Sequence, residues 1–281
     1  MSLFSRELVV CPLGSGSAGN STYVGDGSAG VLVDAGVNPK QVRERMAAAG
    51  LTDAPIDAVL VTHEHADHVG SAAVLSRALA RKGRAVPFFM TRGTAEHTNP
   101  KCVPDGVEHL RPGEELRVRH LLVDPFPICH DTAEPVAFRI ACGGTSVAVV
   151  TDLGRATALV AHQLRMCTVA VLEFNHDAGM LWDGPYPWAL KKRIAGTHGH
   201  LSNEQAGALL ADGLSDTLDT VLLGHLSEHN NTPAHALAAA MTTLRAADAL
   251  APAGGATPRV KVAVAPQRAP AAPIRVRTRS W

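Results

Sequence analysis

The most informative segment of the chain reads Thr62-His63-Glu64-His65-Ala66-Asp67-His68. It follows directly on the apolar residues 58–61, which have the length and composition of a short buried β-strand. If the chain stays extended into the motif, the two-residue spacing of His63 and His65 points both imidazoles to the same side. Asp67 and His68 then fall in the following turn, so all four side chains can converge at one strand end.

Three imidazoles and a carboxylate are ligands that suit zinc, iron or manganese. The alternative interpretation is a polar loop with solvated histidines, which is the better explanation for an isolated His-x-His pair. A complete H-x-H-x-D-H pattern at a strand terminus favours a metal site instead.

Further potential ligands stand at comparable boundaries. Asp152 follows the apolar run 146–151, and His225 follows the run 221–224. His130 follows Pro127-Ile128-Cys129 and precedes Asp131-Thr132. Taken alone, an aspartate at the end of a strand is often a helix cap and a single histidine is often structural. Together with the cluster of four potential ligands, these three residues supply the further ligands that a metal site would need.

The order H-x-H-x-D-H, His, Asp, His resembles the metallo-β-lactamase superfamily over residues 8 to about 225. The resemblance implies two metal ions, with Asp152 bridging them, and the full ligand set His63, His65, Asp67, His68, His130, Asp152 and His225. The implied cofactors are two divalent ions, zinc or manganese, with iron possible. Two such ions lower the pKa of a shared water towards neutrality and clamp the oxygens of a displacement reaction, so no activated serine is needed.

A narrower resemblance, to the YycJ/WalJ group, is carried by further segments. These are Gly14-Ser15-Gly16-Ser17-Ala18-Gly19-Asn20, Asn175-His176-Asp177, Met180-Leu181, Gly184-Pro185-Tyr186-Pro187, Leu190-Lys191-Lys192-Arg193-Ile194, Gly199-His200-Leu201-Ser202-Asn203 and residues 225–231. This resemblance implies a 5′–3′ exonuclease whose partner is a DNA substrate. The alternative function keeps the same metal site for a small-molecule ester, thioester, lactone or cyclic phosphodiester, and a redox or binding module is a third hypothesis.

Besides Asp67, His176 and His200 are the candidate catalytic residues. An imidazole near a scissile phosphate can steady charge or protonate the leaving oxygen. The alternative for each is a hydrogen-bonded histidine that only shapes the pocket. Asp177 could orient His176 or another imidazole. A phosphate contact is one interpretation of the basic residues Lys191, Lys192 and Arg193. A solvated basic helix end explains them slightly better.

The predicted fold class is α/β, a metallo-β-lactamase αββα sandwich of two mixed sheets packed face to face with helices outside. Strand-length runs occur at residues 8–13, 31–34, 58–62, 86–90, 121–126, 137–140, 146–151, 168–172 and 220–223. Helical patterns occur at 39–49, 69–81, 155–163 and 202–210. The predicted domain is 1–250, and 251–281 is an Ala/Pro/Arg-rich segment with a strand at 260–265 and then a tail. The basic tail is interpreted either as a disordered, solubilising extension or as an arm that binds along a nucleic-acid backbone.

The composition excludes several classes of protein. Lysine plus arginine and aspartate plus glutamate are both 26, so net charge gives no argument for a polyanionic partner. The start lacks an apolar signal core and no stretch is long and apolar enough for a bilayer, which predicts a cytoplasmic protein without a membrane partner. Five cysteines without a C-x-x-C pair predict neither a disulfide framework nor a cysteine zinc site, and the pattern assigns no oligomeric state.

Overall fold

The computed structural model describes residues 7–81, 83, 85–249 and 259–278. They group into two compact units. Within the described ranges, the first unit consists of Met1–Pro127, Thr132–Val147 and Pro266–Trp281, and the second of Ile128–Asp131 and Ala148–Ala265. The part of the predicted tail at 251–258 and 279–281 lies outside the described residues.

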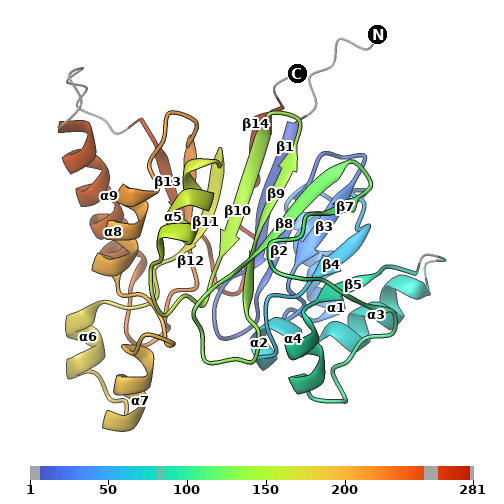
Figure 1. The fold of residues 1–281 in the computed structure, drawn as a ribbon, viewed down its shortest axis with the longest axis horizontal. Coiled ribbons are helices and arrows are strands. Elements are labelled where there is room, and N and C mark those ends of the chain that lie inside the picture. The colour runs from blue at the N-terminus through green and yellow to red at the C-terminus, as the bar shows by residue number, and fades with distance from the viewer. Residues whose placement is uncertain (1–6, 82, 84, 250–258, 279–281) are drawn as a thin grey trace. The chain divides into compact units, whose positions relative to one another are not determined.

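The first sheet belongs to the first unit and has the strand order β14-β1-β2-β3-β4-β5-β6 (Figure 1). The strands β14, β1, β2 and β3 pair antiparallel, whereas β3 to β6 pair parallel. The bounds are β1 Glu7–Gly14, β2 Ser21–Gly25, β3 Gly30–Val33, β4 Ala58–Leu60, β5 Phe88–Met90, β6 Val107–His109 and β14 Ile274–Arg277.

The second sheet has the order β13-β12-β11-β10-β9-β8-β7. Here β7, β8 and β9 pair antiparallel, and β11, β12 and β13 pair parallel, so this sheet is mixed as well. The bounds are β7 Leu116–Val118, β8 Leu121–Pro127, β9 Val136–Cys142, β10 Thr145–Val150, β11 Val169–Glu173, β12 Thr220–Gly224 and β13 Lys261–Val264. Every predicted strand run overlaps one of the observed strands, while β2, β6, β7 and β14 were not predicted.

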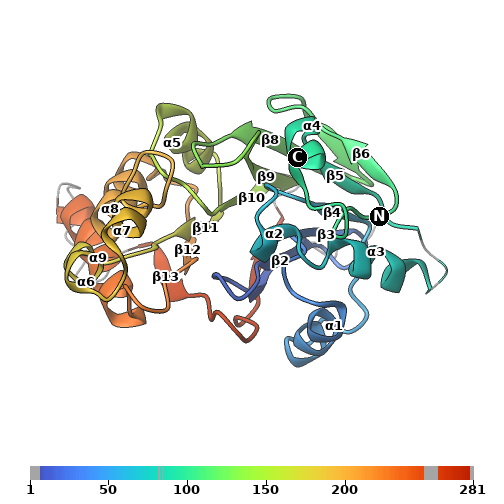
Figure 2. The same ribbon diagram turned by 90° about the horizontal axis from the view of Figure 1, so that it is seen from below.

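The described helices are α1 Pro39–Ala48, α2 Ala66–Val69, α3 Ala72–Ala80, α4 Arg92–His97, α5 Ala158–Arg165, α6 Ala178–Asp183, α7 Trp188–Ile194, α8 Asn203–Asp212 and α9 Pro233–Ala249. Figures 1 and 2 both show α8 beside α9, next to the strands β12 and β13 of the second unit. Among the described residues, no helix combines the length and the apolar character needed to cross a membrane.

Two local features bear on the helix predictions. The capping box of α8 is confirmed, because Ser202 Oγ accepts from the Gln205 amide at 3.2 Å and Gln205 Oε1 accepts from the Ser202 amide at 2.9 Å. The single helix predicted at 69–81 is wrong at its start, since α2 ends at Val69 and a new helix begins at Ala72. Gly70 closes α2, and a Cβ there would lie 2.3 Å from the carbonyl oxygen of Ala66.

The C-terminal segment contributes to both sheets. The strand predicted at 260–265 is confirmed as β13, which pairs parallel with β12. The prediction of a tail beyond it is wrong for Ile274–Arg277, which forms β14 and pairs antiparallel with β1, Val276 lying opposite Leu8. The alternation of Ile274 and Val276 with two arginines is the two-residue period of a strand, and the basic composition of this segment obscured it.

Candidate metal centre

The histidine motif of the first unit forms a tight cluster at the end of β4. His63 and His68 are fully buried, their ring centroids lie 4.0 Å apart, and the centroids of His63 and His65 lie 4.9 Å apart. Asp67 Oδ2 lies 3.3 Å from His68 Nε2. The extended chain and the first turn of α2 therefore bring all four side chains together, as the spacing predicted.

A buried carboxylate orients His68. Asp34 Oδ2 lies 2.8 Å from His68 Nδ1, and Asp34 Oδ1 accepts from the amide and the hydroxyl of Thr62 at 2.8 and 2.9 Å. An imidazole that donates its Nδ1 proton to a carboxylate keeps the lone pair of Nε2 for a cation. Sequence reasoning placed Asp34 in a strand and missed this role, although an acid at the end of an apolar run was the available signal.

The glycine-rich loop before β2 packs against the same motif. Asn20 Nδ2 lies 2.9 Å from His68 Nε2 and donates to Asp67 Oδ2 at 3.0 Å. The Asn20 amide also donates to the carbonyl of Asp67 at 2.7 Å. A Cβ on Gly36 would lie 1.6 Å from that carbonyl oxygen, so only glycine permits this approach. The loop thus connects β1 with β2 and also contacts the motif.

Four potential ligands meet in the second unit, at the ends of strands β10, β11 and β12 and in the segment before α8. Their ligand atoms all lie within 4.8 Å of one another, and the group consists of Asp152, Glu173, His200 and His225. Asp152 Oδ1 lies 3.5 Å from His225 Nε2 and 3.6 Å from His200 Nδ1. His130 Nε2 is 3.8 Å from the same oxygen. Asp152 and His225 both have a positive φ, 59° and 53°, which is uncommon outside glycine and is often found at functional sites.

Glu173 is the residue of this cluster that sequence reasoning missed. It is the last residue of β11 and fully buried, and its Oε1 lies 2.8 Å from His200 Nδ1 and 3.3 Å from His225 Nδ1. Its Oε2 accepts from the amide of Leu153 at 2.7 Å. Burial opposes ionisation, but the interaction with His200 prevails and lowers the pKa of Glu173, while the pKa of His200 is raised despite its burial. An acid closing an apolar run was again the available signal.

His176 lies outside this group. It is buried, forms an isolated bridge with Ser202, and its Nδ1 has no hydrogen-bond partner among the described residues. Burial lowers the pKa of His176 to about 4, so its imidazole is neutral near pH 7. The hypothesis that Asp177 orients His176 is not supported, because Asp177 Oδ1 accepts from the Met180 amide at 2.9 Å and caps α6.

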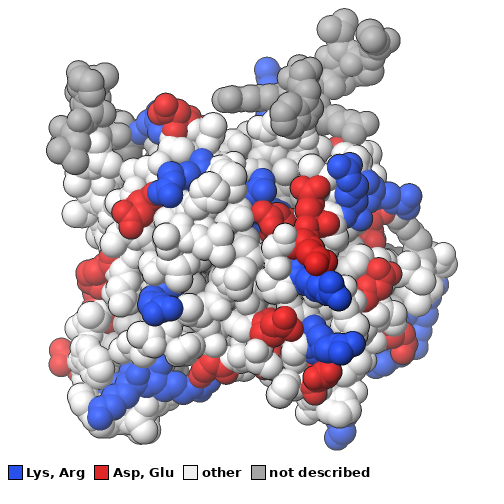
Figure 3. Space-filling view, viewed as in Figure 1, with Lys and Arg blue, Asp and Glu red and all other residues white. Residues whose placement is uncertain are grey.

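Basic side chains gather over α7, at the lower left of the face shown in Figure 3, where both signs of charge are otherwise interspersed. The three basic side chains near the end of α7, Lys191, Lys192 and Arg193, all contact other protein groups. Lys191 Nζ donates to the carbonyl of Trp182 at 2.6 Å, Arg193 pairs with Asp131, and Lys192 Nζ lies 5.4 Å from the centroid of the Trp188 ring. This end of α7 is therefore occupied by internal contacts, which weakens the argument for a phosphate subsite.

The chain is similar to several known proteins. A family model described as beta-lactamase superfamily domain matches residues 30–218. The chain is 33% identical over 222 residues to exodeoxyribonuclease YycJ of Bacillus anthracis, covering 78% of this chain and 82% of the relative. It is 31% identical over 223 residues to exodeoxyribonuclease WalJ of Streptococcus pneumoniae serotype 2 (strain D39 / NCTC 7466), covering 78% and 81%.

Among solved structures, the metallo-beta-lactamase fold protein YhfI from Bacillus subtilis is similar with a TM-score of 0.68 at 17% identity, and the match covers 94% of this chain and 98% of that protein. The chain therefore belongs to the beta-lactamase superfamily, and it is an enzyme of the hydrolase class. The two mixed sheets with their helices, together with this structural match, confirm the predicted fold class.

Proposed function

We propose that this hydrolase is a cytoplasmic, metal-dependent phosphodiesterase that acts as a 5′–3′ DNA exonuclease. One observation carries the proposal: the two relatives at 31% and 33% identity are exodeoxyribonucleases and align with more than three quarters of the chain. The buried histidine and carboxylate clusters in each unit support it, because they supply the ligands that a metal-dependent hydrolase requires.

The proposed ligands of two divalent ions, zinc or manganese, are His63, His65 and His130 for the first, Asp67, His68 and His225 for the second, and Asp152 for both. The side chains fit this role, because Asp34 and Glu173 hold the Nδ1 atoms of His68 and His225, so that the Nε2 atoms carry the lone pairs that a cation requires. When bound, such ions activate a water molecule and neutralise charge on a phosphate. Asp67 is counted with the catalytic residues because it would hold one of the ions that activate the water molecule.

His200 is the proposed general acid. Glu173 Oε1 accepts from its Nδ1, which favours the protonated imidazole and leaves the Nε2 proton available for the departing oxygen. His176 is neutral and therefore better suited to donate a hydrogen bond to a phosphate oxygen than to neutralise its charge. Proton transfer to the leaving group is accordingly assigned to His200.

The experiment measures nucleotide release from 5′-phosphorylated single- and double-stranded DNA by metal-loaded protein. Asp152→Ala and His65→Ala should abolish release, while circular dichroism shows that both variants remain folded. His162→Ala is the matched control, because this exposed histidine of α5 lies outside the clusters.

Two results would contradict the proposal. If loaded wild-type protein releases nothing from DNA, the DNA exonuclease assignment is wrong. If a chromogenic ester or small phosphodiester gives a higher kcat/KM than DNA and depends on Asp152, the same site serves a small-molecule substrate instead.

A further inference from the structure

Three side chains of different chemistry meet elsewhere in the first unit. Asp26 lies in the turn between β2 and β3, His120 lies in the turn between β7 and β8, and Cys142 is the last residue of β9. Their oxygen, nitrogen and sulfur atoms lie within 4.8 Å of one another. None of the three residues belongs to the candidate metal centre.

The position of this cluster in the first sheet separates it from the histidine motif. Asp26 precedes the start of β3, whereas His63 follows the end of β4, and β3 runs parallel to β4 with Val31 opposite Ala58. The two groups therefore lie at opposite ends of the same strands. The cluster is a feature of its own, with no residue in common with the motif.

The two carboxylate oxygens of Asp26 have different partners. Its Oδ1 accepts from the amides of Ser28 and Ala29 at 3.0 and 2.9 Å, which closes the turn. Its Oδ2 lies 2.8 Å from His120 Nε2 and 3.7 Å from Cys142 Sγ. One oxygen thus fixes the side chain to its own turn, and the other is presented to the imidazole and the thiol as a monodentate ligand would be.

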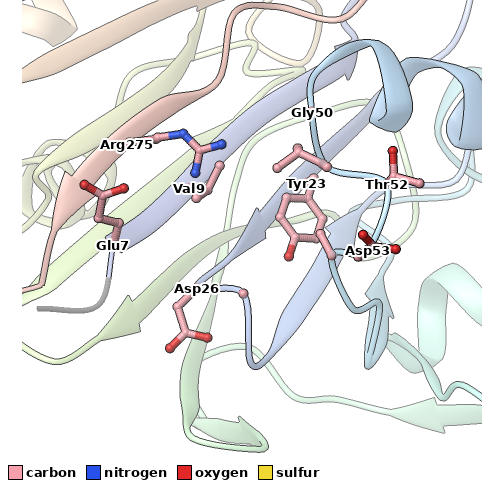
Figure 4. Close-up of a pocket in the computed structure, with 11 residues that line it drawn as sticks. Glu7, Val9, Tyr23, Asp26, Gly50, Thr52, Asp53 and Arg275 are labelled. Carbon is pink, nitrogen blue, oxygen red and sulfur yellow. The ribbon is translucent and has the colours of Figure 1, made fainter. Parts of the chain in front are cut away.

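The three side chains differ in how far they are buried, and this difference suits a metal site at the edge of the unit. The side chain of Asp26 is fully buried and Cys142 is 5% exposed, whereas the side chain of His120 is 36% exposed. A groove of about 630 Å³ reaches Asp26, and Figure 4 shows Tyr23 in it between Asp26 and Asp53. Because the side chain of His120 is partly exposed, solvent can supply a fourth ligand from its side.

We propose that Asp26 Oδ2, His120 Nε2 and Cys142 Sγ form a second, structural site for a divalent cation of the zinc type. One oxygen, one nitrogen and one sulfur ligand suit tetrahedral zinc, whose ligand atoms lie about 3.3–3.7 Å apart at ordinary bond lengths. The 3.7 Å between Cys142 Sγ and Asp26 Oδ2 already fits, and the 2.8 Å between His120 Nε2 and Asp26 Oδ2 opens on binding. The cation ties the β2–β3 turn to the β7–β8 turn and to β9.

Cobalt(II) is the probe, because it takes the same ligands and a cobalt–thiolate bond absorbs in the near ultraviolet. The ligands proposed for the catalytic ions include no cysteine, so this absorption reports on the second site alone. Wild-type protein should develop the band as Co²⁺ is added, and Cys142→Ser should lose it completely. Cys129→Ser and Cys102→Ser, at the two partly buried cysteines, should keep it.

A second variant separates loss of a ligand from loss of the fold. Asp26→Asn keeps an oxygen that accepts from the amides of Ser28 and Ala29, but its amide nitrogen cannot replace Oδ2 as a ligand. Its affinity for Co²⁺ at this site, followed by the thiolate band, should fall at least about tenfold while circular dichroism is unchanged. The proposal is wrong if the wild type shows no band, if Cys142→Ser retains it, or if Cys129→Ser abolishes it.

Discussion

His68 in the first unit and His200 in the second are each held at Nδ1 by a buried carboxylate at 2.8 Å, yet the two carboxylates differ in what they serve. Asp34 holds one imidazole and otherwise binds Thr62, next to the motif. Glu173 contacts the imidazoles of His200 and His225 and binds the amide of Leu153, three separate segments. The four residues of the first cluster come from one short segment, and one buried carboxylate and Asn20 hold it. The second cluster is assembled from distant segments around a single glutamate.

The largest effect in this comparison is expected at His200. His200→Gln removes the proposed proton donor but none of the proposed metal ligands. The value of kcat for DNA should fall about 10²–10⁴-fold with the metal content unchanged, measured by steady-state kinetics and elemental analysis. Loss of bound metal in this variant would show instead that His200 is a ligand.

Glu173→Gln tests the shared glutamate. Both oxygens of Glu173 accept hydrogen bonds, so the amide nitrogen of glutamine must face either the Leu153 amide or the Nδ1 atoms of the two histidines. Metal affinity should fall about 10–100-fold, measured by competition with a chelator. Asp212→Asn, at an exposed carboxylate of the same unit, should bind as the wild type does, and equal affinities for all three proteins would refute the orienting role.

Asp34→Asn tests the carboxylate that serves one imidazole. If its amide donates to His68 Nδ1, the proton of His68 moves to Nε2 and that ligand is lost, but only one histidine is involved. The loss of metal affinity should therefore be about tenfold, smaller than for Glu173→Gln. Asp105→Asn is the control at an exposed aspartate, and an effect of Asp34→Asn exceeding that of Glu173→Gln would reverse the comparison.

The sequence predicted the strands with continuous apolar runs and missed those without them. β6 and β7 are three residues each and partly exposed, and β14 alternates with arginines, so none has an apolar run to detect. The helix α9 was missed because its many alanines give only a weak amphipathic period. The strands β6, β7 and β14 form because neighbouring strands pair with them, and α9 forms because it packs against α8 and β13.

By itself, the sequence determined the family and the local half of the site, because the spacing within His63–His68 is fixed by one strand end and one turn. Only the tertiary structure decided that Glu173 contacts His200 and His225, and that Asp26, His120 and Cys142 meet. The physical reason is that strand pairing, which brings residues together across large separations, depends on burial and register that no local pattern records.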